Sequence, residues 1–197
     1  GDWTLFYQPN SRYVQSGAHP TTMDDLCAQE GCIPAVVPGN FEIDLQRAGR
    51  LEDPFFGQNV LKVQKLEAMH MFYGRRFEYH STAGTAPVLT FEGLDTVAEI
   101  FLNGRRVGRC ENMLIAQTFE LDDLRDGENE LVVHIFPACI AARGRKMSAA
   151  NNALKYDYES LRLRKSASMF GWDIMPRIVS GGIYRPAYIE DRPAERF

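Results

Sequence analysis

The segment from Pro87 to Phe136 constrains the fold more than any other part of the sequence. Within it, two runs of alternating apolar residues flank the dipeptide Asn103-Gly104. Asn and Gly tolerate the left-handed backbone conformation that both central positions of a type I′ turn require. The dipeptide therefore predicts a tight β-hairpin with two residues in its turn.

A two-residue turn also fixes the register of the two strands. Counting outward from the turn, the pairs are Leu102 with Arg105, Ile100 with Val107, and Ala98 with Arg109. Side chains alternate between the two faces of a strand, so Ala98, Ile100 and Leu102 share one face, with Val107 beside them. We expect this face to meet the core.

A third strand closes the unit. The turn cluster Asp126–Asn129 precedes it, and Leu131, Val133 and Ile135 then alternate with their neighbours up to Phe136. Short alternating strands separated by turns are typical of an antiparallel β-sandwich. The fold class predicted is therefore all-β, with eight or more strands.

Other strands and two short helices are predicted around this unit. Strands are expected near residues 3–7, 71–80 and 182–189, with a short apolar run at 33–37. Thr22 begins a sequence with capping-box spacing and Asn40 is a suitable N-cap, so helices are expected at 23–30 and 41–48. Residues 141–168 are rich in Arg and Lys and fit either a helix or an irregular excursion over the surface.

Composition excludes some classes of function. The chain has 197 residues and a net charge of −4, which gives no electrostatic case for nucleic acid binding. No apolar run approaches the roughly 18 residues of a membrane helix. The length fits one domain, residues 1–197. The four cysteines form neither a disulfide framework nor a CxxC motif. They are interpreted as free thiols or small buried groups, and a Cys27–Cys32 disulfide is the lesser alternative. They do not settle the compartment, for which we favour a periplasmic or secreted location.

Motifs for catalysis or metal binding are missing from the sequence. The four histidines are scattered, without HExxH or HxH spacing, so no metal site and no cofactor are expected. His134 lies in a predicted strand and is interpreted as a strand residue rather than a ligand. The adjacent carboxylates Asp24-Asp25 and Asp122-Asp123 lie where Asp caps helices or turns. No catalytic residue is therefore assigned.

The order of several short motifs resembles a known family. FEGLDTVAEIFLNG, VG, ENM and GENEL follow one another as in the N-terminal sandwich domain of glycoside hydrolase family 2. Val37-Pro38-Gly39 with the later DPFFGQN, and Arg164-Lys165 with FGWD and PR, resemble its β-mannosidase branch. The resemblance covers about Trp3 to Ile189. It implies a galactose-binding-domain-like jelly roll with short peripheral helices.

The resemblance also implies partners. In family 2 enzymes the two catalytic glutamates lie on a separate (β/α)8 barrel, and no βαβα pattern occurs in this sequence. The chain is thus expected to be a non-catalytic accessory domain, inactive alone, that packs on the barrel of the same polypeptide and contributes to binding a carbohydrate substrate. An independent carbohydrate-binding module is the alternative, and an interaction sandwich without a carbohydrate ligand is a third.

One loop is the main candidate for substrate binding. Gly171 and Pro176 bracket Trp172, which offers a flat apolar face, and Asp173, which can accept hydrogen bonds from sugar hydroxyls. Residue types alone favour a buried Trp172 with Asp173 paired to Arg177 or Arg164. The resemblance instead implies a loop that reaches the barrel's active site, with Arg177 holding the loop or the carboxylate in place. Ile174-Met175 replaces the Trp-Gly usual in β-mannosidases, which puts the sugar specificity in doubt.

A second loop carries Asn59. Residues 53–59 contain Pro, Gly and Asn together with two adjacent aromatic residues, Phe55 and Phe56. On residue types alone this is a hydrophobic plug under a loop. The resemblance implies a loop at the rim of the active site, where Asn59 could reach a sugar hydroxyl.

Overall fold

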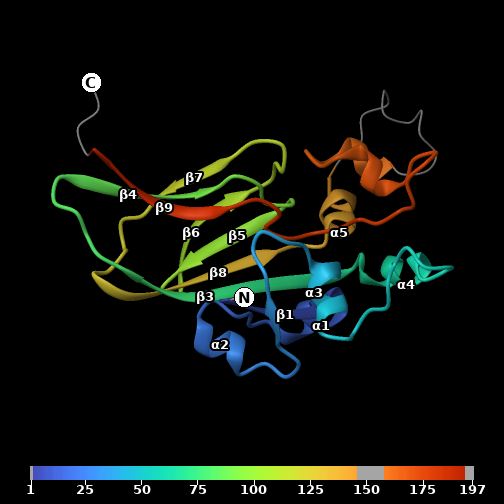
Figure 1. The fold of residues 1–197 in the computed structure, drawn as a ribbon, viewed down its shortest axis with the longest axis horizontal. Helices are drawn as coiled ribbons and strands as arrows, with labels where there is room; N and C mark the ends of the chain where they lie inside the picture. Colours follow the sequence, from blue (N-terminus) through green and yellow to red (C-terminus); the bar gives the residue numbers. More distant parts are fainter. Residues whose placement is uncertain (1, 146–157, 194–197) are drawn as a thin grey trace.

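Two antiparallel sheets stack face to face in the computed structural model, which describes residues 2–145 and 158–193. The larger sheet has six strands in the order β2-β1-β3-β8-β5-β6, and the smaller has three in the order β7-β4-β9 (Figure 1). The strands are β1 Trp3–Pro9, β2 Ile33–Ala35, β3 Met69–Tyr79, β4 Thr85–Phe91, β5 Ala98–Leu102, β6 Arg105–Cys110, β7 Gln117–Glu120, β8 Gly127–Ile135 and β9 Ala187–Pro193. The predicted all-β sandwich is confirmed.

Short helices surround the sandwich. They are α1 Asn10–Ser16, α2 Met23–Cys27, α3 Phe41–Arg47, α4 Val60–Val63 and α5 Ala138–Arg143, with 3-10 turns at η1 Gln64–Leu66, η3 Tyr158–Leu161 and η4 Ala167–Phe170. None of the described helices is long and apolar enough to cross a membrane.

The six-stranded sheet is buried on both faces. Its inner face meets the smaller sheet and α3 in one core that contains Tyr73, Ile100 and Val133. Its outer face carries Phe6, Phe72 and Val132 under α1 and α2 (Figure 1). Strands covered on both sides read as nearly continuous apolar runs, as residues 131–136 do.

The predicted hairpin forms with a change of register. Asn103 and Gly104 both have positive φ, 51° and 79°, and Leu102 pairs with Arg105 as predicted. A bulge between Ile100 and Phe101 then shifts the register by one residue, so Ile100 faces Gly108 and Ala98 faces Cys110. The pairings predicted for Ile100 with Val107 and for Ala98 with Arg109 are wrong.

The bulge has a physical cause in the second sheet. The ring of Phe119 lies against Gly108, where an added Cβ would stand 2.2 Å from ring atoms. Only glycine leaves room for this contact, and the bulge brings Gly108 to it. The core face of the hairpin is unaffected, since Ala98, Ile100 and Leu102 are all fully buried.

Both predicted helices form, and both are shorter than expected. Helix α2 has the predicted capping box between Thr22 and Asp25 but ends at Cys27. Asn40 caps α3 through a 3.0 Å bond from the Ile43 amide. Residues 141–168 were expected to form either a helix or an irregular excursion. Helix α5 extends into the start of this region, and residues 146–157 lie outside the described part of the chain.

The last strand lies later than predicted. Strand β9 begins at Ala187, whereas residues 182–189 were expected to form it. Backbone groups of the earlier residues bond to loops instead: Gly182 exchanges hydrogen bonds with Asp95, and the Tyr184 amide donates to the Gly93 carbonyl. These bonds replace a ladder, so the chain runs irregularly up to Pro186.

The hairpin turn generates a stability prediction. We expect Asn103→Ala to lower the free energy of unfolding by about 3 kcal/mol, because Ala is disfavoured at positive φ and two kinds of side-chain bond are lost. Those bonds join Asn103 Nδ2 to Asn129 Oδ1 at 2.9 Å and the Glu130 amide to Asn103 Oδ1 at 3.0 Å. Urea denaturation measures the loss. Asn103→Gly is the control, since it keeps the conformation and should lose about 1 kcal/mol less; equal losses would contradict the backbone argument.

Candidate functional site

The loop predicted to bind substrate is a tight turn with Asp173 at its tip. Trp172 and Met175 exchange two backbone hydrogen bonds of 3.0 and 3.1 Å, which leaves Asp173 and Ile174 as the two central residues. Gly171, with φ of 111°, allows the chain to leave η4 in the direction of the turn. The backbone therefore presents the two central side chains outward from a closed two-residue turn.

The side chains of this turn are open to solvent. Trp172 is 67% exposed and Ile174 is 88% exposed. The Asp173 carboxylate is also exposed and has neither a hydrogen bond nor an ion pair with any described residue. The reading in which Trp172 is buried and Asp173 is paired to Arg177 or Arg164 is therefore wrong.

Arg177 anchors the base of the turn through another carboxylate. Its Nε and Nη2 donate to Glu67 Oε1 and Oε2, both at 2.7 Å. Its Nη1 donates to the Phe170 carbonyl at 3.3 Å, so the guanidinium also closes the loop on itself. The hydrogen bonds to Glu67 raise the pKa of Arg177. Arg177 thus holds the loop, as one of the two predicted options, and does not hold the Asp173 carboxylate.

Glu67 was not predicted from the sequence. It follows η1 directly and lies 110 positions before Arg177, and no local motif connects the two residues. A bidentate pair between a carboxylate and a guanidinium fixes both distance and orientation. The side chain of Glu67 is 16% exposed and that of Arg177 is 23% exposed, so water screens this pair only in part.

The second loop is exposed rather than packed. Phe55 and Phe56 are each 76% exposed, so the interpretation as a hydrophobic plug is wrong for both rings. Pro54 is the buried residue of this loop. Asn59 donates its Nδ2 to the Asp53 carbonyl at 3.0 Å and thereby closes the loop. Asn59 thus stabilises the loop through this hydrogen bond. Its contact with a sugar hydroxyl stays a prediction.

Both loops lie at the same end of the molecule. In Figure 1 the chain around α4 and the orange segment after η3 occupy the right-hand end of the long axis. An apolar groove of about 280 Å³ lies elsewhere, beside β9, and is lined by Trp3, Phe77 and Tyr188 among others. The Trp172–Met175 turn does not line that groove. It is a projection with an aromatic face and an exposed carboxylate, and not itself a concave site.

Comparison with known families identifies the domain. Residues 14–185 match the family described as glycosyl hydrolase 2 galactose-binding domain-like. The chain belongs to this family. The resemblance to family 2 glycoside hydrolases that the short motifs indicate is thereby confirmed.

The most similar proteins reported are β-mannosidases. β-Mannosidase B of Thermothelomyces thermophilus is 32% identical over 160 residues, which cover 78% of this chain and 18% of that protein. β-Mannosidase B of Aspergillus fumigatus is 30% identical over 174 residues, or 85% of this chain and 21% of that protein. The crystal structure of β-D-mannosidase from Dictyoglomus thermophilum superposes with a TM-score of 0.75 and 28% identity over 96% of this chain and 22% of that one.

The chain therefore spans about a fifth of the length of these relatives. More distant structures share the fold alone. The exo-chitosanase CsxA of Amycolatopsis orientalis superposes with a TM-score of 0.63 at 16% identity and covers 98% of this chain. The same sandwich fold thus occurs in a β-mannosidase and in an exo-chitosanase.

The adjacent carboxylates of this galactose-binding-like domain serve its structure. Asp25 accepts hydrogen bonds from the Thr21 and Thr22 amides at 3.3 Å, and Asp24 pairs with Arg76. Asp123 pairs with Arg105 at 2.6 Å. Asp25 is thus a helix cap, as predicted, whereas Asp24 and Asp123 form ion pairs with arginines.

Three of the four histidines lie close together, although the sequence suggested scattered positions. Tyr13 stacks between His19 and His70 with 3.7 Å between ring centroids on each side, and His134 stacks on Phe72 at 4.2 Å. Among the described residues, no group of three or more His, Cys, Asp or Glu side chains could hold a metal ion. His134 is a packed strand residue, as predicted.

Hydrogen bonds link His134, His70 and Asn10 in a chain that fits two neutral imidazole rings. His70 Nε2 donates to Asn10 Oδ1 at 3.0 Å, so its Nδ1 is left to accept from His134 Nε2 at 2.9 Å. Burial lowers the pKa of His134 to about 2 and that of His70 to about 4. Protonating His70 at Nδ1 would also break its bond with His134.

These histidines generate a pH prediction. The unfolded chain binds their protons near pH 6.5, whereas the folded domain does not, so stability is full above that pH and falls as the pH drops. The expected slope is about 1.4 kcal/mol per pH unit for each neutral histidine. Urea denaturation at pH 7.5, 6.5 and 5.5 measures it. His134→Phe keeps the stacking on Phe72 and should show a shallower slope; equal slopes would contradict the assignment. Burial raises the pKa of Glu42 and Asp44, so their contribution to stability falls as the pH rises. This opposite contribution is the same in the wild type and in His134→Phe.

Proposed function

We propose that residues 1–197 form one domain, the non-catalytic N-terminal sandwich of a family 2 glycoside hydrolase of the β-mannosidase type. In this proposal the domain packs on the catalytic (β/α)8 barrel of the same polypeptide. It supplies the Trp172–Met175 turn to the pocket that binds the sugar. The membership in the family and the similarity to β-mannosidases support the first part.

One observation carries the proposal for the turn: Asp173 is an exposed carboxylate, without a hydrogen bond or ion pair to any described residue, on a backbone that is held firmly. A free aspartate on a mobile loop would lose conformational entropy on binding. Here two backbone bonds close the turn, and the Arg177–Glu67 pair holds its base. Asp173 can therefore accept hydrogen bonds from sugar hydroxyls at little entropic cost, while Trp172 offers an apolar face to the ring.

The shape of the turn supports an accessory role. Sites for small ligands are concave and cover most of the ligand surface. The turn projects from the domain, with Trp172 and Ile174 mostly exposed, so it offers only one wall of such a site. A second surface must supply the other walls and the two carboxylates of glycoside hydrolysis. In this proposal that surface is the barrel, and Asn59 lies on the neighbouring rim.

An independent carbohydrate-binding module is the competing function. The exposed rings of Phe55, Phe56 and Trp172 at one end of the domain are the observation that favours it. A module of this kind should bind oligosaccharides without a barrel. Calorimetry on the isolated chain separates the two functions: submillimolar affinity for a manno- or galacto-configured sugar would favour the module.

The first prediction concerns catalysis by the isolated chain. We expect no hydrolysis of aryl β-mannosides or β-galactosides, because the chain supplies neither a proton donor nor a nucleophile at one sugar site. Release of the aryl group by purified chain, followed by absorbance, is the measurement. The control is the full polypeptide with its barrel, assayed at equal concentration. Turnover by the isolated chain that persists through purification would refute an accessory role.

The second prediction concerns Asp173 in the full polypeptide. Asp173→Asn should lower kcat/KM by about tenfold to a thousandfold, since each charge-assisted hydrogen bond contributes roughly 1.5–3 kcal/mol. The melting temperature should stay unchanged, because this side chain has no partner within the described part of the domain. Asp122→Asn, another single carboxylate-to-amide change in an exposed position, is the matched control. Wild-type kcat/KM for Asp173→Asn would remove the residue from the sugar site.

A further inference from the structure

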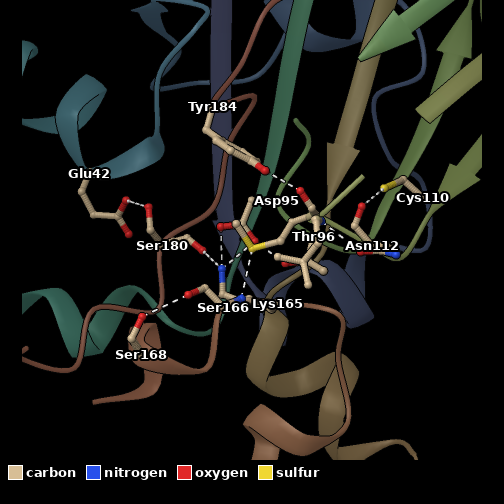
Figure 2. Close-up of polar contacts among 12 residues, drawn as sticks. Glu42, Asp95, Thr96, Cys110, Asn112, Lys165, Ser166, Ser168, Ser180 and Tyr184 are labelled. Carbon is tan, nitrogen blue, oxygen red and sulfur yellow. Dashed lines mark hydrogen bonds and ion pairs between the residues drawn. The ribbon is translucent and has the colours of Figure 1, made fainter. Parts of the chain in front are cut away.

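A buried ammonium group joins the two ends of the segment that carries the turn. Lys165 and Ser180 lie on either side of η4 and the Trp172–Met175 turn. Figure 2 shows Lys165 Nζ donating to both carboxylate oxygens of Asp95, each at 2.6 Å, and to the Ser180 carbonyl at 2.7 Å. An ammonium has three N–H donors, and all three have acceptors here.

The surroundings of Lys165 are closed to water. Its side chain is 0% exposed and that of Asp95 is 4% exposed. Asp95 lies just before β5 and exchanges backbone hydrogen bonds of 2.9 and 3.2 Å with Gly182. Ser180 donates its hydroxyl to Glu42 of α3 at 2.6 Å (Figure 2). The Lys165 ammonium therefore connects the start of a central strand to both ends of the loop.

Stability alone is a weak reason for such a pair. Moving two charges out of water costs several kcal/mol per ion, and apolar replacements of similar volume are often as stable. An ammonium differs from an apolar side chain because it requires three acceptors in fixed directions. Here those acceptors belong to two segments that are 15 and 70 positions away from Lys165. The pair thus specifies where the loop leaves the sandwich.

Two anchors on different strands define the direction of the turn. Arg177 is tied to Glu67, just before β3, whereas Lys165 is tied to Asp95, just before β5. Between them, the Ile178 amide donates to the Met169 carbonyl at 3.1 Å and makes the loop one unit. The Arg164 carbonyl also accepts a hydrogen bond from the Met113 amide at 3.0 Å, so the loss of one anchor loosens this unit without releasing it, and the displacement is largest at the tip, at Asp173.

We infer that Lys165, held by Asp95, is a positioning residue that sets the place of Asp173 in the sugar site. The inference rests on the proposed function of the turn. It adds that substrate binding depends on a buried pair remote from the turn tip. A displacement of about 1 Å at a binding group can cost on the order of a hundredfold in rate.

The test removes both charges together. Lys165→Met alone would leave the Asp95 carboxylate buried without its cation, and the resulting loss of stability would obscure any effect on positioning. The double variant Lys165→Met/Asp95→Asn, made in the full polypeptide, avoids this problem. We expect kcat/KM on an aryl β-mannoside to fall roughly tenfold to a hundredfold. Hydrogen exchange within residues 165–180 should rise, while strands β3 and β8 stay protected.

A double-mutant cycle with Asp173→Asn separates positioning from general damage. If Lys165 acts through Asp173, adding the double variant to Asp173→Asn should lower kcat/KM by no more than about twofold, because coupled residues are not additive. Arg76→Met is the control: it removes a cation from an exposed pair with Asp24 of α2, away from the loop (Figure 1). It should leave kcat/KM and exchange in residues 165–180 unchanged.

The results that would overturn the positioning role of Lys165 differ from those that would overturn the proposed function of the turn. Unchanged exchange in residues 165–180, or a full additional loss of kcat/KM in the Asp173→Asn background, would overturn the positioning role of Lys165. Wild-type kcat/KM for Asp173→Asn alone, together with raised exchange in the double variant, would overturn the proposed function of the turn. Lys165 would then be an anchor of the loop without a part in substrate binding.

Discussion

The pairing of β3 with β8 is the constraint on which the rest of the domain depends. The two strands are paired from Met71 with Ile135 to Tyr79 with Gly127, the longest register in the structure. Residues 70–74 of β3 and 131–135 of β8 are buried on both faces, so this part of the pair must be covered on both sides to exclude water. The smaller sheet and α3 cover one face, and α1 and α2 cover the other. The smaller sheet and the helices α1, α2 and α3 therefore each have a place set by the face that they cover.

The loops at the end of the sandwich follow a different rule. They bury a few apolar side chains, such as Leu163 and Phe170, and hydrogen-bonded charges hold them as well. Lys165 with Asp95 and Arg177 with Glu67 join segments 70 and 110 positions apart. Exposed pairs such as Lys62 with Glu52 contribute little to stability because water competes for both groups. The two buried or half-buried pairs differ because their directional bonds decide where a loop lies.

This division fits a domain that contributes to a site without forming all of it. The core supplies a rigid body, and the anchored loops present Trp172 and Asp173 at a defined place on its surface. Fold alone does not fix function, since sandwiches of this kind occur in enzymes that act on different glycosides. In the proposed function, the sugar that is bound then depends on the residues of one short turn and on the surface that faces it.

The sequence by itself determined what depends on neighbouring residues. The Asn103-Gly104 turn, the caps at Thr22 and Asn40, and the alternating strands are local patterns, and the structure contains all of them. The turn from Trp172 to Met175 was also visible as a bracketed loop with two functional residue types. Its exposure was not, because the residue types alone favour a buried Trp172 and a paired Asp173.

Only the tertiary structure decided which distant groups meet. Phe119 lies against Gly108, at the place where the hairpin register shifts. Arg177 pairs with Glu67 and not with Asp173. The Lys165 ammonium pairs with the Asp95 carboxylate. The rings around His134 gather from three separate segments in the same way. In each case the partners are more than ten positions apart, and a carboxylate or a ring has the same local pattern whichever partner it contacts. The choice is made by the packing of the whole chain, which brings some candidates within bonding distance and keeps the others apart.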